Sequence, residues 1–294
     1  MNIMITGGTG FIGSALTEFF LQQGHNITIL TRNTRNLPNI RVIQSIKKIN
    51  SAEKIDVIIN LAGATINKRW SNSYKKELIN SRLTITQDVI SLIKKLQSKP
   101  RLLISASAIG YYGLQNNNHI DETSSYVDDF THKLCRLWES EAKKAEEFGV
   151  RTCITRLGVV LGKNGGALKE ILPIFKLGLG GKIGSGKQWF SWVHIGDVIG
   201  VFDFLINNKK QKGVFNLTSP DPISNCKFTQ TLGKIVNRPT IFTIPKFVID
   251  LLFGEMGNSL LLSGSAVYPD KLLRCGYKFQ HKSLDKALEN IVQK

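Results

Sequence analysis

The glycines near the start of the chain are the residues whose type and spacing point most directly to chemistry. Gly7, Gly10 and Gly13 follow a short apolar run and open a segment with helical periodicity. Glycine allows a tight turn and a close approach of a ligand, while the free N–H groups of a helix start favour an anion. This G-x-x-G-x-x-G spacing is a variant of the G-x-G-x-x-G pattern and predicts a site for the pyrophosphate of a dinucleotide. The alternative is a glycine-rich turn that binds nothing.

A basic residue follows the second expected strand. Enzymes that use NAD place a carboxylate there, about 20 residues after the glycines, where it binds the ribose 2′-hydroxyl. This chain has no carboxylate at that point and reads Thr31-Arg32-Asn33. Because an arginine can pair with a 2′-phosphate through two parallel hydrogen bonds, Arg32 predicts NADP rather than NAD. The alternatives are that Arg32 is only an exposed loop residue, or that Arg35 binds the phosphate.

The segment Asn60-Leu61-Ala62-Gly63 ends another apolar run. Small residues at the carboxyl end of a parallel strand leave room for a cofactor, because ligands of such sheets bind beyond that edge. We therefore expect this segment beside the glycine turn. A strand-end turn without a ligand would have the same composition.

These segments need a scaffold that brings the ends of several strands together. Short apolar runs without polar alternation are interspersed with longer runs of helical periodicity, which is typical of parallel strands buried on both faces. The predicted fold class is therefore α/β, with a Rossmann-type doubly wound parallel sheet. Strands are expected at residues 3–6, 26–31, 57–61, 101–105 and 151–157, and helices at residues 11–23, 74–96 and 131–147.

The second part of the chain has a different character, with many glycines among apolar residues after residue 162. Loops and short elements should dominate there. We expect an NADP-binding Rossmann domain over residues 1–162 and, over residues 163–294, a smaller C-terminal cap region. Residues 213–217 are expected to return a strand to the main sheet.

The segment around His194 has alternating aromatic residues and is interpreted as a packed strand. His194 could in principle act as an acid or base in a pocket, but a structural role is the favoured interpretation. Asp197 is expected to be the N-cap of a helix that begins near residue 198.

The composition sets limits on function. With 294 residues, of which 42% are hydrophobic and 21% charged, the chain is typical of a globular protein with a large core. Its formal charge of +17 raises the question of nucleic-acid binding. The basic residues are scattered in pairs rather than gathered in a run, so we expect no nucleic-acid partner. We interpret the charge as solvated surface that also attracts an anionic cofactor.

The cysteines, the apolar segments and the first residues argue against four further classes. The four cysteines are far apart with no C-x-x-C pair, so we expect reduced thiols rather than a zinc site or a disulfide framework. Residues 248–262 are apolar but are interrupted by Asp250 and Glu255, so we expect no membrane span. The first residues lack the basic and apolar regions of a signal peptide. We predict a cytoplasmic protein with neither a metal nor a membrane partner.

Taken together, these motifs resemble one family over nearly the whole chain. The matching segments are residues 6–13, 31–32, 60–63, 105–113 and 181–197. The chain is similar to the atypical extended short-chain dehydrogenases called the epimerase family, relatives of nucleotide-sugar epimerases. The resemblance implies cofactor contacts at Gly7, Gly8, Thr9, Gly10, Phe11, Ile12, Thr31, Arg32, Asn60, Leu61, Ala62, Gly63, Glu77, Arg82 and Val160, to which the glycine spacing adds Gly13.

Three of these residues depend on the resemblance alone. Glu77 and Arg82 have the spacing of solvated charges on a surface helix. Val160 has the setting of a core strand residue and would contact the cofactor through its backbone.

Enzymes of the wider superfamily use a serine or threonine with a Tyr-x-x-x-Lys pair, in which lysine lowers the pKa of the tyrosine. Ser107 matches the hydroxyl, although it could equally bond local backbone. Residues 133–139, where the pair should lie, contain no tyrosine four places before a lysine. Tyr111 and Tyr112 are the remaining candidate phenols, with pocket walls or core as their alternative role.

Two functions follow from this pattern. The first is an NADP-dependent oxidoreductase or epimerase that acts on an unidentified small substrate. The second is a non-catalytic NADP-binding protein with a regulatory or redox-sensing role, which would explain the missing Tyr-x-x-x-Lys pair.

Overall fold

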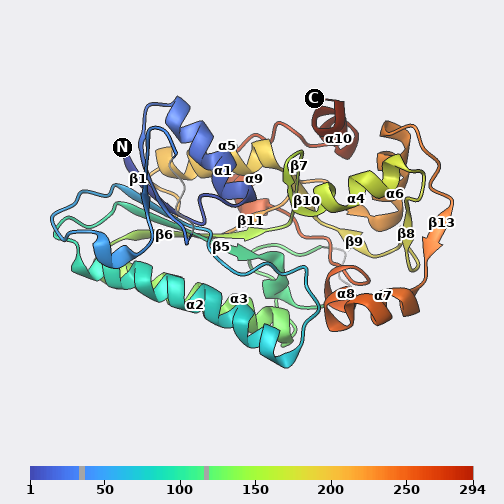
Figure 1. Cartoon of the computed structure of the whole chain (residues 1–294), viewed down its shortest axis with the longest axis horizontal. Coiled ribbons are helices and arrows are strands. Elements are labelled where there is room, and N and C mark those ends of the chain that lie inside the picture. The colour runs from blue at the N-terminus through green and yellow to red at the C-terminus, as the bar shows by residue number, and fades with distance from the viewer. Residues whose placement is uncertain (33–36, 116–118, 294) are drawn as a thin grey trace.

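A seven-stranded parallel sheet forms the centre of the molecule, with strand order β11-β6-β5-β4-β1-β2-β3 (Figure 1). The structure is a computed structural model that describes residues 1–32, 37–115 and 119–293. The strands are β1 (Asn2–Thr6), β2 (Asn26–Leu30), β3 (Ile40–Ile43), β4 (Val57–Asn60), β5 (Leu102–Ala108), β6 (Arg151–Leu157) and β11 (Gly213–Leu217). This arrangement confirms the predicted α/β class with a Rossmann-like sheet.

Helices cover both faces of the sheet. Helices α1 (Phe11–Gln22), α5 (Ile195–Asn207) and α9 (Asp270–Arg274) lie on one face, and α2 (Asn72–Lys95) and α3 (Phe130–Lys143) on the other (Figure 1). Successive strand residues point to opposite faces. Ile3 and Ile5 of β1 accordingly pack with α1 and α5, while Met4 packs with α2 and α3. Double burial explains why the strands read as continuous apolar runs.

Smaller elements extend the molecule at one end (Figure 1). They comprise three strand pairs, namely β7 (Val159–Gly162) with β10 (Trp192–His194), β8 (Gly181–Ile183) with β13 (Phe242–Ile244), and β9 (Trp189–Phe190) with β12 (Ile223–Ser224). The helices there are α4 (Gly166–Lys176), α6 (Asn225–Ile235), α7 (Lys246–Phe253), α8 (Glu255–Leu260) and α10 (Leu284–Gln293). Short 3-10 turns are η1 (Ile46–Lys48), η2 (Ile109–Tyr112) and η3 (Lys144–Phe148). The division at residue 162 stays a prediction, while β11 pairs with β6 in the main sheet.

Two local features differ from the sequence-based expectation. Strand β3 was not expected, because only four residues form it and Arg41 interrupts its apolar run. The expected N-cap at Asp197 is wrong: α5 begins at Ile195, and the ring of its N-cap His194 accepts the N–H of Gly196 at 3.0 Å. His194 thus has the structural role that we expected.

The carboxylate of Asp197 serves a different purpose. It is fully buried and accepts the backbone N–H groups of Gln280 at 2.7 Å and His281 at 2.9 Å. Asp197 therefore ties the segment before α10 to the start of α5. The ring of His281 lies 3.7 Å from that of His194, centroid to centroid.

The structure also bears on membranes and metals. No helix in the described ranges is long and apolar enough to cross a bilayer. Within the same ranges, no three histidine, cysteine or acidic side chains gather as a metal site would require.

Helix α1 packs against the turn after β1 at a distance that only glycine allows. A Cβ atom on Gly13 would lie 2.2 Å from the carbonyl oxygen of Gly7 and 2.7 Å from the Cα of Gly8. Both neighbours are backbone, so they cannot rotate away. The third glycine of the motif is therefore required by packing as well as by any ligand.

We expect Gly13→Ala to lower the free energy of unfolding by about 1–3 kcal/mol, because the added methyl group overpacks this contact. Denaturant unfolding followed by circular dichroism measures the change. Ser14→Ala is the matched control on the same helix, where the exposed side chain predicts a change within about 0.5 kcal/mol. Equal stability of Gly13→Ala and the control would contradict the packing argument.

Candidate functional site

The glycine turn lies at the carboxyl end of β1 and has the geometry of an anion cradle. Gly7 has φ of 70°, a region that favours glycine, and its carbonyl accepts the N–H of Gly10 at 2.9 Å. Gly10 is the N-cap of α1 and provides no side-chain cap. Because Gly10 has no side chain, the N-cap position leaves the first N–H groups of α1 available to a phosphate.

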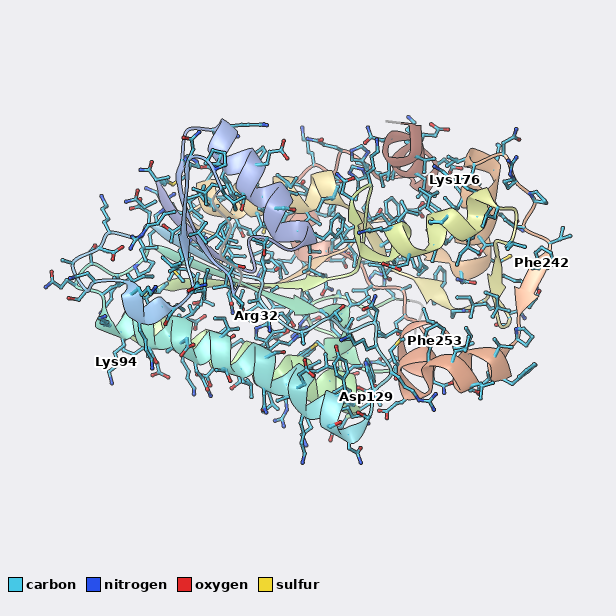
Figure 2. The ribbon with its side chains drawn as sticks, viewed as in Figure 1. Arg32, Lys94, Asp129, Lys176, Phe242 and Phe253 are labelled. Carbon is cyan, nitrogen blue, oxygen red and sulfur yellow. The ribbon has the colours of Figure 1, made fainter. Side chains whose placement is uncertain are left out.

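The ends of β2 and β1 meet beside this turn. The hydroxyl groups of Thr9 and Thr31 lie 3.4 Å apart, and the N–H of Thr31 donates to Ile43 at 3.0 Å. Arg32 follows directly and is exposed (Figure 2). None of the described carboxylates forms an ion pair with Arg32. Its expected alternative, Arg35, lies outside the described residues.

Asn60 is a positioning residue rather than a side-chain ligand. It is fully buried, its Oδ1 accepts the Thr6 hydroxyl at 2.7 Å, and its Nδ2 donates to Thr86 at 2.9 Å and to Ser105 at 3.3 Å. Thr6 in turn accepts the N–H groups of residues 61 and 62 at 3.1 and 3.2 Å. These bonds occupy the amide of Asn60 and hold the segment from Leu61 to Gly63 beside the glycine turn. A cofactor would meet its backbone.

Arg82 and Glu77 are separated by the structure. The guanidinium of Arg82 lies next to Gly63, donates to the carbonyl of Ala64 at 3.2 Å and lies 5.2 Å from the centre of the Trp138 ring. Burial lowers the pKa of Arg82, and no described carboxylate pairs with it. Glu77 is exposed, and a step of five residues turns it roughly 140° around the helix. Arg82 therefore lies beside the segment that ends β4, while the side chain of Glu77 points in another direction, and a cofactor contact at either residue stays a prediction.

Phe11 and Val160 are expected cofactor contacts whose side chains pack against neighbouring segments. Val160 is 9% exposed and pairs in register with Val193. The ring of Phe11 fills the space beside two glycines, since a Cβ on Gly165 would lie 2.5 Å and one on Gly162 2.7 Å from that ring. The chain after β7 therefore closes over the start of α1, and the side chains of both residues contribute packing.

Ser107 is part of a buried ion-pair network. Its hydroxyl donates to Glu139 Oε1 at 2.7 Å, and Arg156 binds the same carboxylate through Nε at 2.8 Å and Nη2 at 2.9 Å. All three side chains are nearly fully buried. Burial alone would lower the pKa of Arg156, but its hydrogen bonds to Glu139 outweigh this and raise it. The proton of Ser107 is therefore committed to Glu139.

Glu139 and Arg156 were not among the functional candidates expected from the sequence. A signal was present, because Arg156 lies within the strand expected at residues 151–157, and an arginine there requires a partner once that strand is buried. The partner, Glu139, lies on α3, and the spacing of residues in the sequence does not identify it.

The two tyrosines after β5 have different environments. Tyr112 is fully buried and donates to Asn216 Oδ1 at 2.6 Å, and burial raises its pKa to about 12. This setting gives Tyr112 a packing role. Tyr111 is half-buried, and the guanidinium of Arg156 lies 3.3 Å from the centre of its ring. The face of α3 directed toward Ser107 carries Glu139 and the buried thiol of Cys135, not a tyrosine and a lysine.

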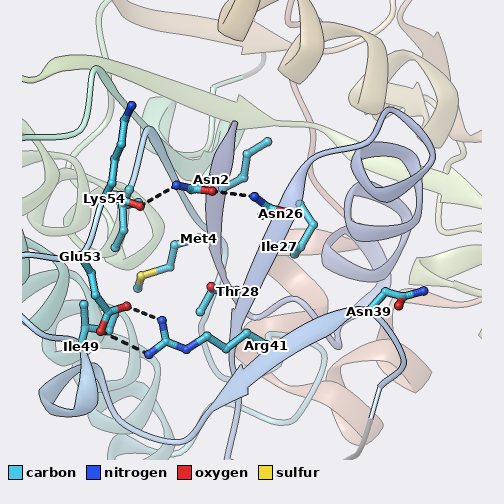
Figure 3. Close-up of a pocket in the computed structure, with 12 residues that line it drawn as sticks. Asn2, Met4, Asn26, Ile27, Thr28, Asn39, Arg41, Ile49, Glu53 and Lys54 are labelled. Atoms are coloured by element: carbon cyan, nitrogen blue, oxygen red, sulfur yellow. Dashed lines mark hydrogen bonds and ion pairs between the residues drawn. The ribbon is translucent and has the colours of Figure 1, made fainter.

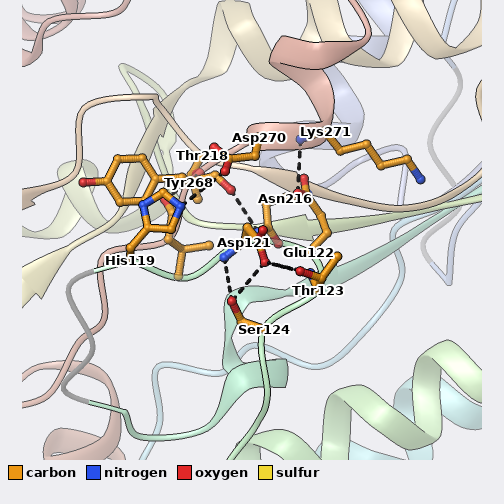
Figure 4. A network of polar contacts seen from close by, with 11 residues as sticks. His119, Asp121, Glu122, Thr123, Ser124, Asn216, Thr218, Tyr268, Asp270 and Lys271 are labelled. Atoms are coloured by element: carbon orange, nitrogen blue, oxygen red, sulfur yellow. Dashed lines mark hydrogen bonds and ion pairs between the residues drawn. The ribbon is translucent and has the colours of Figure 1, made fainter.

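The loop after Tyr112 is anchored to the C-terminal part of the chain (Figure 4). Glu122 accepts the N–H of Asn216 at 2.9 Å and the N–H of Lys271 at 3.1 Å. Burial raises the pKa of Glu122. Asn216 is also the acceptor of the Tyr112 hydroxyl, so the network fixes η2 to β11.

A cavity of about 380 Å³ lies away from this site, beside the first residues of β1 and β2 (Figure 3). Its amides are mutually bonded, with Asn26 donating to Asn2 at 3.0 Å and Asn2 donating to the carbonyl of Lys54 at 3.0 Å. Arg41 and Glu53 form an ion pair across it. The polar side chains named here bond to one another, and their hydrogen bonds and ion pair hold the sheet against residues 49–55.

We expect Glu139→Gln to destabilise the protein by about 3 kcal/mol, because it leaves the guanidinium of Arg156 buried without its counter-charge. Chemical unfolding at neutral pH measures the change. Glu141→Gln on the same helix is the control, since its partner Lys144 is half exposed and a much smaller effect is expected. Similar losses in both variants would refute the structural importance of the buried pair.

Comparison with known proteins agrees with this architecture. Residues 3–218 match the NAD dependent epimerase/dehydratase family, and residues 244–291 match a domain of unknown function, DUF1731. The chain is 37% identical to epimerase family protein YfhF of Bacillus subtilis over 99% of this chain and 98% of that protein. It is 36% identical to the chloroplastic SDR39U1 homolog of Arabidopsis thaliana, covering 100% of this chain and 87% of the relative.

Solved structures extend the comparison. The human epimerase family protein SDR39U1, crystallised with NADPH, superposes with a TM-score of 0.91 at 33% identity, and both chains are covered completely. UDP-glucose 4-epimerase of Thermotoga maritima has a TM-score of 0.80 at 19% identity, with 100% of this chain and 98% of that chain covered, and shares the fold. The family resemblance expected from the sequence is thus confirmed. The chain belongs to the NAD dependent epimerase/dehydratase family.

Proposed function

We propose that the protein binds NADP(H) in preference to NAD(H). The observation that carries this proposal is the exposed Arg32, without a described carboxylate partner, directly after Thr31 and beside the glycine turn. The pyrophosphate would lie on the N–H groups of residues 11–13, and the guanidinium of Arg32 would pair with the 2′-phosphate. The NADPH in the structure of the human relative supports the same cofactor.

We further propose that the protein is an oxidoreductase or epimerase acting on a small substrate. When bound, the nicotinamide supplies or accepts the hydride. Among the three hydroxyl candidates, Tyr111 is the proposed proton donor, because its ring is half-buried beside Arg156 and Tyr112 is sealed in the core. Ser107 donates to Glu139 and would therefore act only as an acceptor toward a substrate hydroxyl.

The second candidate is a non-catalytic NADP-binding protein with a regulatory or redox-sensing role. A specific observation favours it: the Ser107 hydroxyl donates its hydrogen bond to Glu139, and Cys135 lies where α3 approaches that serine. Such a site would bind the nucleotide and leave it chemically unchanged.

We place the protein in the cytoplasm, supported by four cysteines that are all free. The net charge of +17 would attract the anionic cofactor, and no nucleic-acid partner is proposed.

Calorimetric titration with NADPH and NADH tests the cofactor proposal. We expect Arg32→Ala to weaken NADPH about 10- to 100-fold and to leave NADH unchanged, because only the 2′-phosphate is lost as a partner. Arg136→Ala removes the same charge from an exposed position on α3 and should change neither affinity. If wild-type protein binds both nucleotides equally, the assignment to Arg32 fails.

Deuterium transfer separates the two candidate functions without knowledge of the substrate. The protein is incubated with NADPH deuterated at nicotinamide C4 and a pool of small carbonyl compounds and nucleotide sugars, and the products are analysed by mass spectrometry. We expect label in a small molecule, lost in Tyr111→Phe but retained in Tyr126→Phe, whose ring is about half exposed. The absence of NADPH-derived label despite tight binding, with no NADP⁺ reduction by nucleotide sugars, would favour the non-catalytic protein.

A further inference from the structure

An apolar surface lies at the end of the molecule formed by β13, α7 and the turn after α4. We call it the apolar end and define it by Leu177, Leu179, Ile241, Phe242, Phe247, Leu251 and Leu252, which are all exposed. Figure 2 places Phe242 at the tip of this end, with Lys176 and Phe253 on either side. The segments are neighbours because β13 pairs with β8, the strand that follows Leu179. Clustered exposed apolar side chains mark an interaction site.

Helix α7 carries apolar residues on both its inner and its outer face. Its Ile249 is buried at 3% exposure, as expected for the inner face. Phe247 and Leu251, one turn apart, are 68% and 71% exposed, and Leu252 is 57% exposed. Ile241, just before β13, is 80% exposed. A helix with apolar residues on both sides needs a second apolar environment.

Cations surround the apolar end. Lys246 begins α7, and Arg69 donates to the carbonyl of Leu251 at 2.7 Å near its last turn. Arg238 donates to the carbonyl of Lys176 at 2.9 Å, next to Leu177. None of these four cations forms an ion pair with a described carboxylate. The opposing charge is small, because Asp250 is the one acidic residue of α7 and nearby Glu255 is paired with Lys75.

We propose that the apolar end docks on the surface of an anionic phospholipid bilayer, with α7 lying in the interface. Apolar Leu, Ile and Phe side chains would enter the acyl region while the four cations contact headgroup phosphates, as in interfacial amphipathic helices. This partner is peripheral, so it is compatible with the absence of a spanning helix among the described residues. From the sequence, residues 248–262 argue only against a membrane span, and no membrane partner was expected.

Charge and composition favour lipid over protein occupants. A second copy would bring together two chains of +17 and place like cations opposite one another. Protein interfaces are enriched in aromatic residues, Met and Arg at their centres, and Leu is under-represented among the residues that dominate binding, whereas five of the seven apolar-end residues are Leu or Ile. Each side chain protrudes from a helix, strand or turn, which suits a deformable bilayer.

Co-sedimentation with lipid vesicles tests the proposal. We expect the full chain to bind vesicles of phosphatidylcholine mixed with phosphatidylglycerol, to bind weakly to phosphatidylcholine alone, and to be released by salt. The double variant Phe247→Ser with Leu251→Ser should reduce binding at least about tenfold, since it removes two inserted apolar side chains. Lys246→Glu should also weaken binding while leaving the apolar residues intact.

The control variant is Leu273→Ser on α9, which removes a 43% exposed leucine outside the apolar end and should leave vesicle binding unchanged. Unchanged NADPH affinity and thermal midpoint establish that each variant is folded. Failure of the wild-type chain to bind anionic vesicles overturns the proposal, as does equal loss in the control. If the chain instead self-associates in sedimentation equilibrium, and the double variant abolishes this, the apolar end is an interface between copies.

Discussion

A side chain at residue 13 would put its Cβ 2.2 Å from the carbonyl oxygen of Gly7, so α1 can reach its place against β1 only through glycine. This close approach sets the direction in which the first N–H groups of α1 point. It also brings Gly7 against residues 61 and 62 at the end of β4, with an added Cβ only 3.1 Å from the nearest atom of that segment. The Thr6–Asn60 hydrogen bond then holds the two strand ends together. The candidate cofactor site is the edge that these contacts create.

The second constraint is the burial of charge behind that edge. Glu139 and Arg156 satisfy one another through two hydrogen bonds, and Ser107 supplies a third to the carboxylate. An isolated charge at this depth would be costly, so each partner depends on the others. Because the Ser107 hydroxyl donates its hydrogen bond to Glu139, its hydrogen is directed into this network.

The C-terminal part of the chain is joined to the sheet by polar contacts at specific points. Asp197 binds the backbone before α10, and Glu122 binds both β11 and α9. Helix α7 and strand β13 lie far from these bonds, at the end of the molecule, where many of their side chains are exposed. That end combines apolar side chains with cations that form no ion pair with a described carboxylate, whereas at the sheet edge Arg82 lies over the buried ring of Trp138.

The sequence by itself determined the doubly wound class, the glycine turn, and the place of Arg32 after the second strand. These features depend on short-range spacing and on apolar runs, which indicate the same local structure wherever the segment packs. The sequence could not predict β3, because four residues interrupted by Arg41 form a strand only when β2 lies beside them. It also assigned the cap of α5 to Asp197, where the packed histidine at position 194 caps instead.

Only the tertiary structure decided which polar residues meet. Ser107 and Glu139 are 32 residues apart and Glu139 and Arg156 are 17 apart, and no periodicity connects them. The burial of Tyr112, the partial exposure of Tyr111 and the outward direction of Phe247 likewise depend on what other segments cover. A buried donor or charge takes the partner that packing brings within reach, and that choice belongs to the folded chain rather than to its local pattern.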